Sequence, residues 1–463
     1  MNRRIRIGYW DRSCRETLWF PHDSHVILVA PSGTGKLRDV LAPLAMSWPG
    51  SLIWVDPKLQ AAAVLGRHLA ENLKHDVKVL NPFGILEPYL RALKPARYNP
   101  MACLRPNWLG FGADCESIAE GIVVEEMRGS EGNHWALSAR DLVAGLTAAL
   151  AKYCDAPDRN LTVVRSLICG RELFEFCRSA MRSNDPFLMQ KLGRFAAPGA
   201  EENKEILGII SSAITQSSFI GNEAIAESLK ESTFSFRDLK RRPTALFFGL
   251  PARYLSPCSK WFRLIIAAAM NELLQEERGV PVLLALDEFA QLGHLKVIEN
   301  AMALARGFGA QLLCVLQDLN QLKGTYRDSW ETFLANAGCR IFFAPQDKFS
   351  SDYVSALAGE HEVRNVSKSV NDGPNEPGLN VGPHSRRYLL PHEVRDLNGD
   401  EMLVFGQGIP GVIRAGRRPY YQSPEFAGLY DPDPYHLPTA EVTKSQRLPR
   451  AGLRWLGQGG ARG

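Results

Sequence analysis

Long hydrophobic segments are missing from this 463-residue chain, and their absence argues against an integral membrane protein. A membrane-spanning helix needs about 18 consecutive apolar residues. The apolar run at 264–270 is much shorter, and charged residues bound it. The N-terminus is basic, but the apolar residues 5–9 are too few for the core of a signal peptide. The sequence therefore predicts a soluble chain.

Cysteine spacing of the kind that forms disulfide frameworks or zinc sites is also missing. The chain has nine cysteines, an odd number, and no two of them form a C-x-x-C pair. Most lie in apolar or helical stretches, for example Cys169, Cys314 and Cys339. We therefore expect buried thiols in a reducing compartment.

A strong excess of charge of one sign is the third feature that the chain lacks. Lys and Arg number 54 and Asp and Glu number 50, which gives a net charge of +4. This balance permits contact with nucleic acid but does not argue for it. The basic clusters at 240–242, 386–387 and 417–418 are predicted to be solvated surface.

Short apolar runs alternate with helical patterns along much of the chain, which predicts an α/β protein with a mainly parallel sheet. The length and an apolar content of 45% indicate two or three globular domains. The expected strands are residues 26–30, 52–55, 245–250, 282–287, 310–317 and 339–344. A hairpin is expected from 402–405 to 412–414, whereas 365–386, rich in Ser, Asn, Gly and Pro, is expected to be a mobile loop.

Two adjacent carboxylates end one of these apolar runs. Residues 282–286 read VLLAL and are followed by Asp287 and Glu288. The carboxyl ends of parallel strands form the edge at which α/β proteins bind ligands. Asp287 could hold magnesium or its waters, and Glu288 could orient or deprotonate an attacking water. The alternative is an acidic helix N-terminus, where carboxylates interact favourably with the helix dipole.

A glycine-rich turn after the apolar residues 26–29 predicts a phosphate-binding loop. The residues expected to bind nucleotide here are Ala30, Pro31, Ser32, Gly33, Thr34, Gly35, Lys36 and Leu37. Glycines let backbone N–H groups converge on phosphate, and Lys36 would reach the β- and γ-phosphates. In the pattern G-x-x-x-x-G-K-[ST], Ala30 replaces the first glycine and Leu37 replaces the hydroxyl residue. The alternative is an ordinary tight turn. A helix should follow, kinked or shortened by Pro43.

The sequence separation between Lys36 and Asp287 predicts an inserted domain. About 250 residues are too many for a connection within one compact sheet. Residues 105–200 have helical periodicity, with an apolar face along 139–150. We expect the nucleotide-binding domain to consist of 1–104 and 236–432, with an inserted all-α domain at 105–235 and a flexible C-terminal tail at 433–463.

Several motifs together resemble the coupling ATPases of conjugation and type IV secretion, the TraG-like or VirD-type family. The most specific run comprises 286–293 (LDEFAQLG), 305–309 (ARGFG), 317–322 (QDLNQL) and 331–338 (ETFLANAG). Upstream, the motifs similar to the same family are 30–36 (APSGTGK), 47–50 (SWPG), 56–58 (DPK), 98–100 (YNP) and 134–135 (HW). The resemblance covers about residues 22–430. It implies a RecA-like P-loop NTPase with an inserted all-α domain.

The resemblance also implies roles for individual residues. Lys36 matches the phosphate-loop lysine, Asp287 the magnesium acid and Glu288 the catalytic acid. Gln317 would sense the γ-phosphate, and its alternative role is an amide that bonds the next turn. Asp56 of the DPK motif is expected to lie at the nucleotide. The implied cofactors are ATP and Mg²⁺.

The implied assembly is a homo-hexamer at the cytoplasmic face of the bacterial inner membrane. It would receive single-stranded DNA with its relaxase, or protein effectors, and deliver them to the components of the secretion channel. Arg306 would reach a neighbouring subunit's nucleotide as an arginine finger. The alternative for Arg306 is a cation that complements the end of a helix dipole.

Three departures from the family pattern leave other functions open. The family usually begins with membrane helices, so this chain is expected to be a split or shortened member, a soluble form, or one recruited by a membrane-anchoring partner. Leu37 is bulkier than the usual residue, and Leu59-Gln60 stands where the family tends to have Gly-Glu. These last two motivate one alternative, a weak or inactive nucleotide-binding scaffold that docks substrates. A DNA translocase of the FtsK/HerA type is the other, and the motif at 331–338 argues against it.

Overall fold

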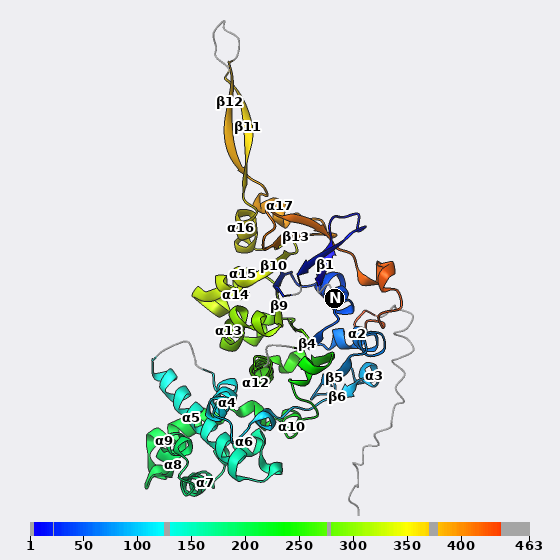
Figure 1. Cartoon of the computed structure of the whole chain (residues 1–463). Coiled ribbons are helices and arrows are strands. Elements are labelled where there is room, and N and C mark those ends of the chain that lie inside the picture. The colour runs from blue at the N-terminus through cyan, green and yellow to red at the C-terminus, as the bar shows by residue number, and fades with distance from the viewer. Residues whose placement is uncertain (1–3, 22, 125–129, 276–278, 370–377, 437–463) are drawn as a thin grey trace, which may run out of the picture.

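The computed structural model describes residues 4–21, 23–124, 130–275, 279–369 and 378–436. Within these ranges, twelve strands form one sheet, and helices cover both of its faces (Figure 1). A helical region and a two-stranded ribbon extend from opposite ends of the molecule (Figure 1). The fold thus has a sheet core with two appendages.

Eight neighbouring strands of the sheet are parallel. In spatial order they are β10 (Ala337–Phe342), β3 (His25–Val29), β9 (Ala310–Leu316), β8 (Val282–Leu286), β4 (Ser51–Val55), β7 (Thr244–Phe248), β5 (Asp76–Leu80) and β6 (Lys94–Pro95). The antiparallel extension beside β10 consists of β13 (Glu401–Gly406), β14 (Ile413–Gly416), β1 (Arg4–Tyr9) and β2 (Thr17–Pro21). The predicted α/β class, the six predicted strands and the predicted hairpin are confirmed.

The central strands are mostly apolar because both faces of the sheet are covered. Successive residues point to opposite faces, so Ile27 and Val29 of β3 join one core, whereas Val26 and Leu28 join the other. The second core contains α1 (Ala42–Met46) and α2 (Gln60–Glu71). Strands β1 and β5 escaped the sequence analysis because charged residues interrupt their apolar runs, as Asp76 and Lys78 do in β5.

The residues between β6 and β7 are mainly helical. The principal helices are α4 (Phe111–Ile122), α5 (Ser130–Tyr153), α6 (Leu161–Cys169), α7 (Leu173–Met181), α8 (Pro186–Ala196), α9 (Lys204–Gln216) and α10 (Glu223–Ser228). Side chains of Asn160, Asp185, Asn203 and Asn222 cap four of these helices at their N-termini by accepting backbone N–H groups. The predicted apolar face along 139–150 is buried in the core of this helical region.

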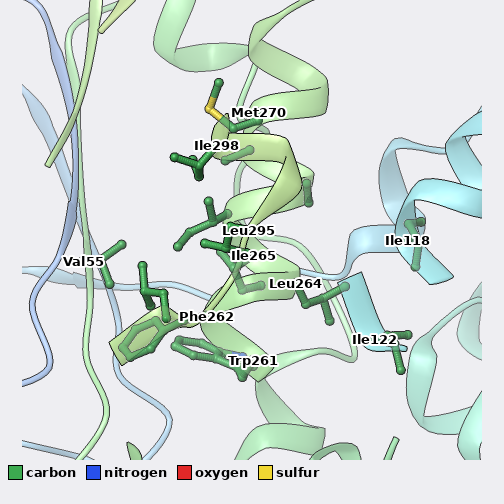
Figure 2. Packing of buried hydrophobic residues seen from close by; sticks show 14 of the residues in the cluster. Val55, Ile118, Ile122, Trp261, Phe262, Leu264, Ile265, Met270, Leu295 and Ile298 are labelled. Atoms are coloured by element: carbon green, nitrogen blue, oxygen red, sulfur yellow. The ribbon is translucent and has the colours of Figure 1, made fainter. Parts of the chain in front are cut away.

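One long helix, α12 (Leu255–Leu273), connects the helical region to the sheet (Figure 2). The labelled side chains of Figure 2 come from α12, from Ile118 and Ile122 of α4, from Val55 of β4, and from Leu295 and Ile298 in or beside α13 (Lys296–Leu304). All of these side chains belong to one continuous core. Full burial of such a side chain contributes about 1.5–3 kcal/mol, so the insertion shares much of its stability with the sheet.

The prediction of a loop at 365–386 is wrong for the described part of that segment. Residues 360–369 and 378–387 form β11 (Glu360–Ser369) and β12 (Gly378–Arg387), which pair antiparallel in a ribbon (Figure 1). Residues 370–377 lie outside the described ranges. Backbone pairing between two strands needs no apolar face, and composition alone therefore missed it.

The prediction of buried thiols needs one correction. Cys314 and Cys339 are buried as expected, but Cys169 is exposed, because α6 buries the stripe formed by Leu161, Val164 and Ile168. The nine cysteines are all free thiols. Among the described helices, none combines the length and apolarity that a bilayer span requires.

The basic clusters contain two buried members. Lys240 is 4% exposed and contacts the backbone carbonyl of Phe308. Arg417 is 7% exposed and lies under the phosphate-loop segment. Burial of both cations is possible because backbone carbonyl or carboxylate oxygens accept their hydrogen bonds. A pattern of charge along the chain does not reveal such partners.

Candidate nucleotide site

The carboxyl edge of the parallel strands brings three predicted site residues together. Lys36 follows β3, and Asp287 and Glu288 follow β8, with β9 between these two strands. Lys36 Nζ lies 2.8 Å from Asp287 Oδ1 and 3.0 Å from Glu288 Oε1. Because all three strands run in the same direction, their carboxyl ends meet at one edge despite the long sequence separation.

The glycine-rich turn has the conformation that a phosphate loop requires. Gly33 and Gly35 have φ angles of +77° and +89°, in the left-handed region that favours glycine. A Cβ at Gly33 would meet nothing within 4 Å, so the loop is open to a ligand at that point. Thr34 closes the turn by donating its N–H and its hydroxyl to the Pro31 carbonyl, at 3.3 and 2.7 Å.

The helix after the loop begins with a π-helical turn, η1 (Leu37–Leu41), which leads into α1. Pro43 lies directly after this π-helical turn, and the backbone of Leu41 and Ala42 is helical, so the helix continues through the boundary. The irregularity expected at Pro43 takes the form of the π-helical turn before it. Leu37 packs against the apolar core below the loop and supplies no hydroxyl group.

A buried ion pair that the sequence analysis missed anchors this loop. Arg417 donates to Asp39 Oδ2 at 3.0 Å and to the Thr34 carbonyl at 2.5 Å. Arg38 donates to both carboxylate oxygens of Asp39, at 2.6 and 3.0 Å. The guanidinium carbon of Arg417 also lies 4.0 Å from the centre of the Phe343 ring. The loop is thus fixed to the antiparallel part of the sheet, since Arg417 directly follows β14.

Glu288 is held in a specific orientation. Its backbone has a φ of +68°, and Gln317, at the carboxyl end of β9, donates from Nε2 to Glu288 Oε2 at 3.2 Å. Glu288 therefore contacts Lys36 through one oxygen and Gln317 through the other. The predicted Gln317 joins the same cluster as Lys36, Asp287 and Glu288.

Burial and charge set the ionisation of the cluster. Burial opposes the charge on Lys36, but Asp287 and Glu288 outweigh it and raise the Lys36 pKa above its ordinary value. Burial raises the pKa of Asp287 despite the nearby Lys36. Burial acts in the same direction on Glu288, but Lys36 and Gln317 outweigh it, and the pKa of Glu288 is lowered. Glu288 is therefore the more readily ionised of the two acids.

Asp56 lies beside this cluster at the end of β4. It is 4% exposed, and its two oxygens accept backbone N–H groups of Lys58 and Ala61, at 3.0 and 2.7 Å. Burial, followed by the charge of Asp287, raises the pKa of Asp56 to about 7. Asp56 thus belongs to the electrostatic environment of the site, and its contact with nucleotide stays a prediction.

The Leu59-Gln60 departure has a structural explanation. Leu59 is fully buried with a φ of +52° and lies so close to Gly249 that a Cβ there would overlap it. Gln60 Nε2 donates to Asp433 Oδ2 at 2.6 Å, and the Tyr435 hydroxyl donates to the Lys58 carbonyl at 3.1 Å. Residues 433–436 of the expected tail therefore contact the loop after β4, whereas 437–463 lie outside the described part of the chain.

Arg306 does not join the cluster. It lies in η8 (Ala305–Phe308) before the start of β9, and donates to Asp23 Oδ2 at 2.8 and 3.1 Å. This is the amino edge of the sheet, and a seven-residue strand separates it from the carboxyl edge by roughly 20 Å. Arg306 therefore cannot reach the phosphate loop of its own chain.

The parallel sheet, the glycine-rich turn and the lysine–carboxylate cluster define a RecA-like P-loop NTPase fold that carries a helical insertion. The chain matches the family described as "Type IV secretory system Conjugative DNA transfer" over residues 4–447. It belongs to that family, which confirms the resemblance found in the sequence motifs.

Named relatives agree with this assignment. The chain is 26% identical over 417 residues to "Probable conjugal transfer protein TraG" of Sinorhizobium fredii, covering 86% of this chain and 62% of the relative. It is 23% identical over 417 residues to "Type IV secretion system-coupling protein VirD4" of Bartonella quintana, covering 87% of this chain and 64% of the relative. The chain thus spans a little under two thirds of these relatives.

Solved structures show the same fold. The "bacterial conjugative coupling protein TrwBdeltaN70" is similar with a TM-score of 0.67, 20% sequence identity and 86% coverage of each chain. TrwB in complex with ADP and Mg²⁺ gives a TM-score of 0.64 at 19% identity, covering 86% of this chain and 87% of that chain.

Proposed function

We propose that this chain is an ATP-driven coupling protein of a type IV secretion or conjugation system. It would receive single-stranded DNA with its relaxase, or protein effectors, and deliver them to the export channel. The observation that carries the proposal is the position of Lys36 Nζ, 2.8 Å from Asp287 and 3.0 Å from Glu288. Family membership and the names of the TraG and VirD4 relatives support it.

ATP and magnesium are the proposed ligands of this site. The open loop at Gly33 fits a phosphate group, and TrwB in complex with ADP and Mg²⁺ supports the same pairing here. Among the described residues, no three His, Cys, Asp or Glu side chains gather into a metal-binding group. Asp287 would therefore hold magnesium together with phosphate oxygens and water, as is usual for this ion. Bound magnesium would neutralise charge on the phosphates.

The side chains of the cluster suit hydrolysis. Lys36 would exchange its contacts with the two acids for contacts with phosphate oxygens. Glu288, released from Lys36 but still bonded to Gln317, would orient a water and accept its proton, because the amide of Gln317 donates to one carboxylate oxygen and favours the ionised form. Lys36 and the loop N–H groups would spread the charge that develops in the transition state.

Arg306 supports an assembly of several subunits. Since it lies at the amino edge of the sheet, it would act as a finger only on the nucleotide of a neighbouring copy. Its ion pair with Asp23 would open when that neighbour binds. We propose a head-to-tail homo-hexamer at the cytoplasmic face of the bacterial inner membrane, recruited by a membrane-anchoring partner. Residues 1–104 and 236–432 would form its motor, and 105–235 its all-α domain.

The test is ATP turnover by the purified chain, measured with and without single-stranded DNA. The Lys36→Ala and Glu288→Gln variants should each lose about 100-fold or more in kcat, because each removes a contact to developing charge or to the attacking water. Lys348→Ala, an exposed lysine on another helix, is the control and should behave as wild type. Unchanged turnover in both site variants would show that the cluster is not an ATPase site.

A second candidate, a weak or inactive nucleotide-binding scaffold, rests on Leu37. This residue offers no hydroxyl oxygen to magnesium and is instead partly buried against the core. The scaffold would be favoured if the wild-type chain binds ATP measurably but turns it over no faster than Glu288→Gln does. In that case Leu37→Thr, which supplies the missing hydroxyl, should raise the affinity for magnesium–ATP.

A further inference from the structure

A separate hollow of about 640 Å³ opens where the helical insertion meets the sheet. Four segments line it: the residues just before α4, the first turns of α4, Arg237 just before α11 (Asp238–Arg241), and the end of α12 with Gln275. None of its lining residues belongs to the nucleotide site.

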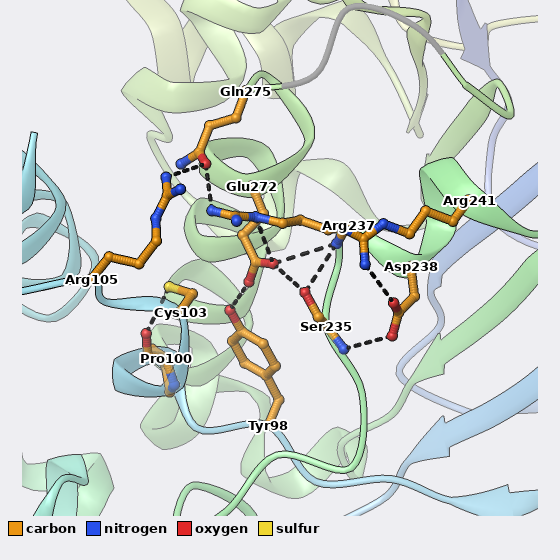
Figure 3. Close-up of polar contacts among 10 residues, drawn as sticks. All are labelled: Tyr98, Pro100, Cys103, Arg105, Ser235, Arg237, Asp238, Arg241, Glu272 and Gln275. Carbon is orange, nitrogen blue, oxygen red and sulfur yellow. Dashed lines mark hydrogen bonds and ion pairs between the residues drawn. The ribbon is translucent and has the colours of Figure 1, made fainter. Parts of the chain in front are cut away.

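Two guanidinium groups face this hollow without a carboxylate directly between them. Arg105 Nη2 and Arg237 Nη2 both donate to the single neutral oxygen Gln275 Oε1, at 3.3 and 2.5 Å (Figure 3). The Arg237 side chain forms an ion pair with Glu272 only at long range, with 4.0 Å between Arg237 Nε and Glu272 Oε2. Guanidinium groups match phosphate through paired hydrogen bonds, so one amide oxygen leaves most of their donor capacity free.

An aromatic side chain stands beside these cations. The Trp108 indole is 50% exposed, and the Arg105 guanidinium carbon lies 4.9 Å from its ring centre. A Cβ at Gly110 would come 2.5 Å from Trp108 Nε1, so a glycine is needed for the indole to lie against the start of α4. The ring is therefore positioned by its surroundings although half of it faces solvent.

Two acidic side chains, Asp114 and Glu272, lie near these cations. Asp114 lines the hollow, and burial raises the pKa of this carboxyl against the effect of Arg105 and Arg237. Glu272 is 2% exposed and engaged by the hydroxyls of Tyr98 and Ser235, at 2.5 and 2.7 Å (Figure 3). Ala113 in the first turn of α4 also lines the hollow, and the N-cap residue Gly110 provides no side-chain cap.

We propose that this hollow binds one nucleotide of a single-stranded DNA, with the phosphate on Arg105 and Arg237 and the base on Trp108. A positively charged groove with an aromatic platform is the usual way to hold a single strand without reading its sequence. Asn271 and Ser117 supply neutral hydrogen-bonding groups beside the base. The site adds a DNA contact to the proposed function, and it rests on that function for the identity of the strand.

The position of the hollow would let a bound strand act on the junction of the insertion. Tyr98 precedes the inserted helices and Ser235 follows them, and Glu272 bonds both. The backbone N–H of Arg237 also donates to Glu272, at 3.4 Å, while its side chain bonds Gln275. A phosphate that draws Arg237 away from Gln275 would therefore pull on the segment that connects insertion and sheet.

The experiment is fluorescence anisotropy of a labelled 12-nucleotide oligo-dT with the full chain. Arg105→Gln and Trp108→Ala should each weaken binding about fivefold or more, because each removes a phosphate contact or a stacking surface. Arg105→Gln should also lower the slope of log Kd against log salt by about 0.7. Both residues are exposed, and unchanged thermal unfolding will show that the variants fold.

Matched controls are Arg91→Gln and Trp10→Ala, an exposed arginine and a half-exposed tryptophan elsewhere on the surface, which should bind as wild type. Wild-type affinity in both hollow variants would overturn the site. If the two hollow variants bind DNA normally but no longer bind an acidic peptide that wild type binds, the result would also overturn the DNA site. It would then assign the hollow to protein cargo.

ATP turnover measured on the same samples separates this site from the proposed function. If DNA-stimulated turnover is present and the hollow variants bind normally, only the site fails. If wild type binds the strand through the hollow but hydrolyses no ATP, the site stands and the motor assignment fails.

Discussion

The two polar sites of this molecule differ in how their charges are matched. At the carboxyl edge of the sheet, one cation, Lys36, is paired with two carboxylates and is largely buried. In the hollow at the base of the insertion, Arg105 and Arg237 share one neutral amide oxygen and stay partly exposed. In the first site the charges are matched, so Lys36 must exchange its partners when a ligand binds. In the second site, guanidinium N–H groups remain available to a ligand. Rigid parallel strands allow the first arrangement, and a junction between helices and loops favours the second.

The largest expected effect is a loss of stability when the ion pair beneath the phosphate loop is removed. Arg417→Ala leaves Asp39 buried with only Arg38 as a cationic partner, and it removes the bond to the Thr34 carbonyl. Removing one partner of a buried ion pair costs about 3–5 kcal/mol. We expect a loss of that size in urea unfolding and weaker nucleotide binding. Arg418→Ala, the neighbouring residue, is the control and should cost less than about 1 kcal/mol. Equal effects of the two changes would contradict the anchoring role.

A smaller effect should appear as a dependence of stability on pH. The folded-state pKa of Asp56 is raised to about 7, above its ordinary value of 3.8. The folded chain therefore holds a proton that the unfolded chain loses between these values, and stability should fall as pH rises from 4 to 7. The loss is at most about 4 kcal/mol from this group.

The measurement for Asp56 is urea unfolding at several pH values. Asp56→Asn cannot ionise, so its stability should fall less steeply over the same range, whatever its absolute value. An identical pH slope in the variant and the wild type would show that Asp56 is not the group that titrates.

The smallest effect concerns the insertion alone. Asn160 caps α6 by accepting the N–H groups of Thr162 and Val163, at 3.0 and 3.2 Å. Asn160→Ala should cost about 1 kcal/mol, the usual value of an N-cap. Thermal unfolding should register this loss, while nucleotide affinity at the sheet edge should not change. Asn107→Ala, an exposed asparagine, serves as the control. A change in nucleotide affinity for Asn160→Ala would mean that the two regions are more tightly coupled than their separate contacts indicate.

Much of the candidate site could be predicted because it rests on short apolar strands. The runs before Lys36, before Asp287 and before Gln317 are strands whose ends share an edge, and a strand with both faces buried leaves a clear apolar signal. Arg417 could not be predicted in the same way. Its role depends on β14 lying near the phosphate loop, and nothing in the local sequence encodes that distance.

The same limit applies to the ribbon and to the C-terminal segment. Strands β11 and β12 are polar, so composition indicated a loop, yet their backbones pair along ten residues each. Gln60 and Tyr435 are unremarkable polar residues in sequence, and their bonds to Asp433 and to the Lys58 carbonyl arise from long-range packing.

The sequence by itself determined the six central strands, the glycine turn, the paired acids and the helical character of the insertion. These follow from local periodicity and residue type, which act over a few neighbouring positions. Tertiary structure decided which strand ends meet, which cations are buried, and that Arg306 lies at the edge opposite Lys36. Those outcomes depend on contacts between residues far apart in the chain, and their free energy is gained only when the whole sheet assembles.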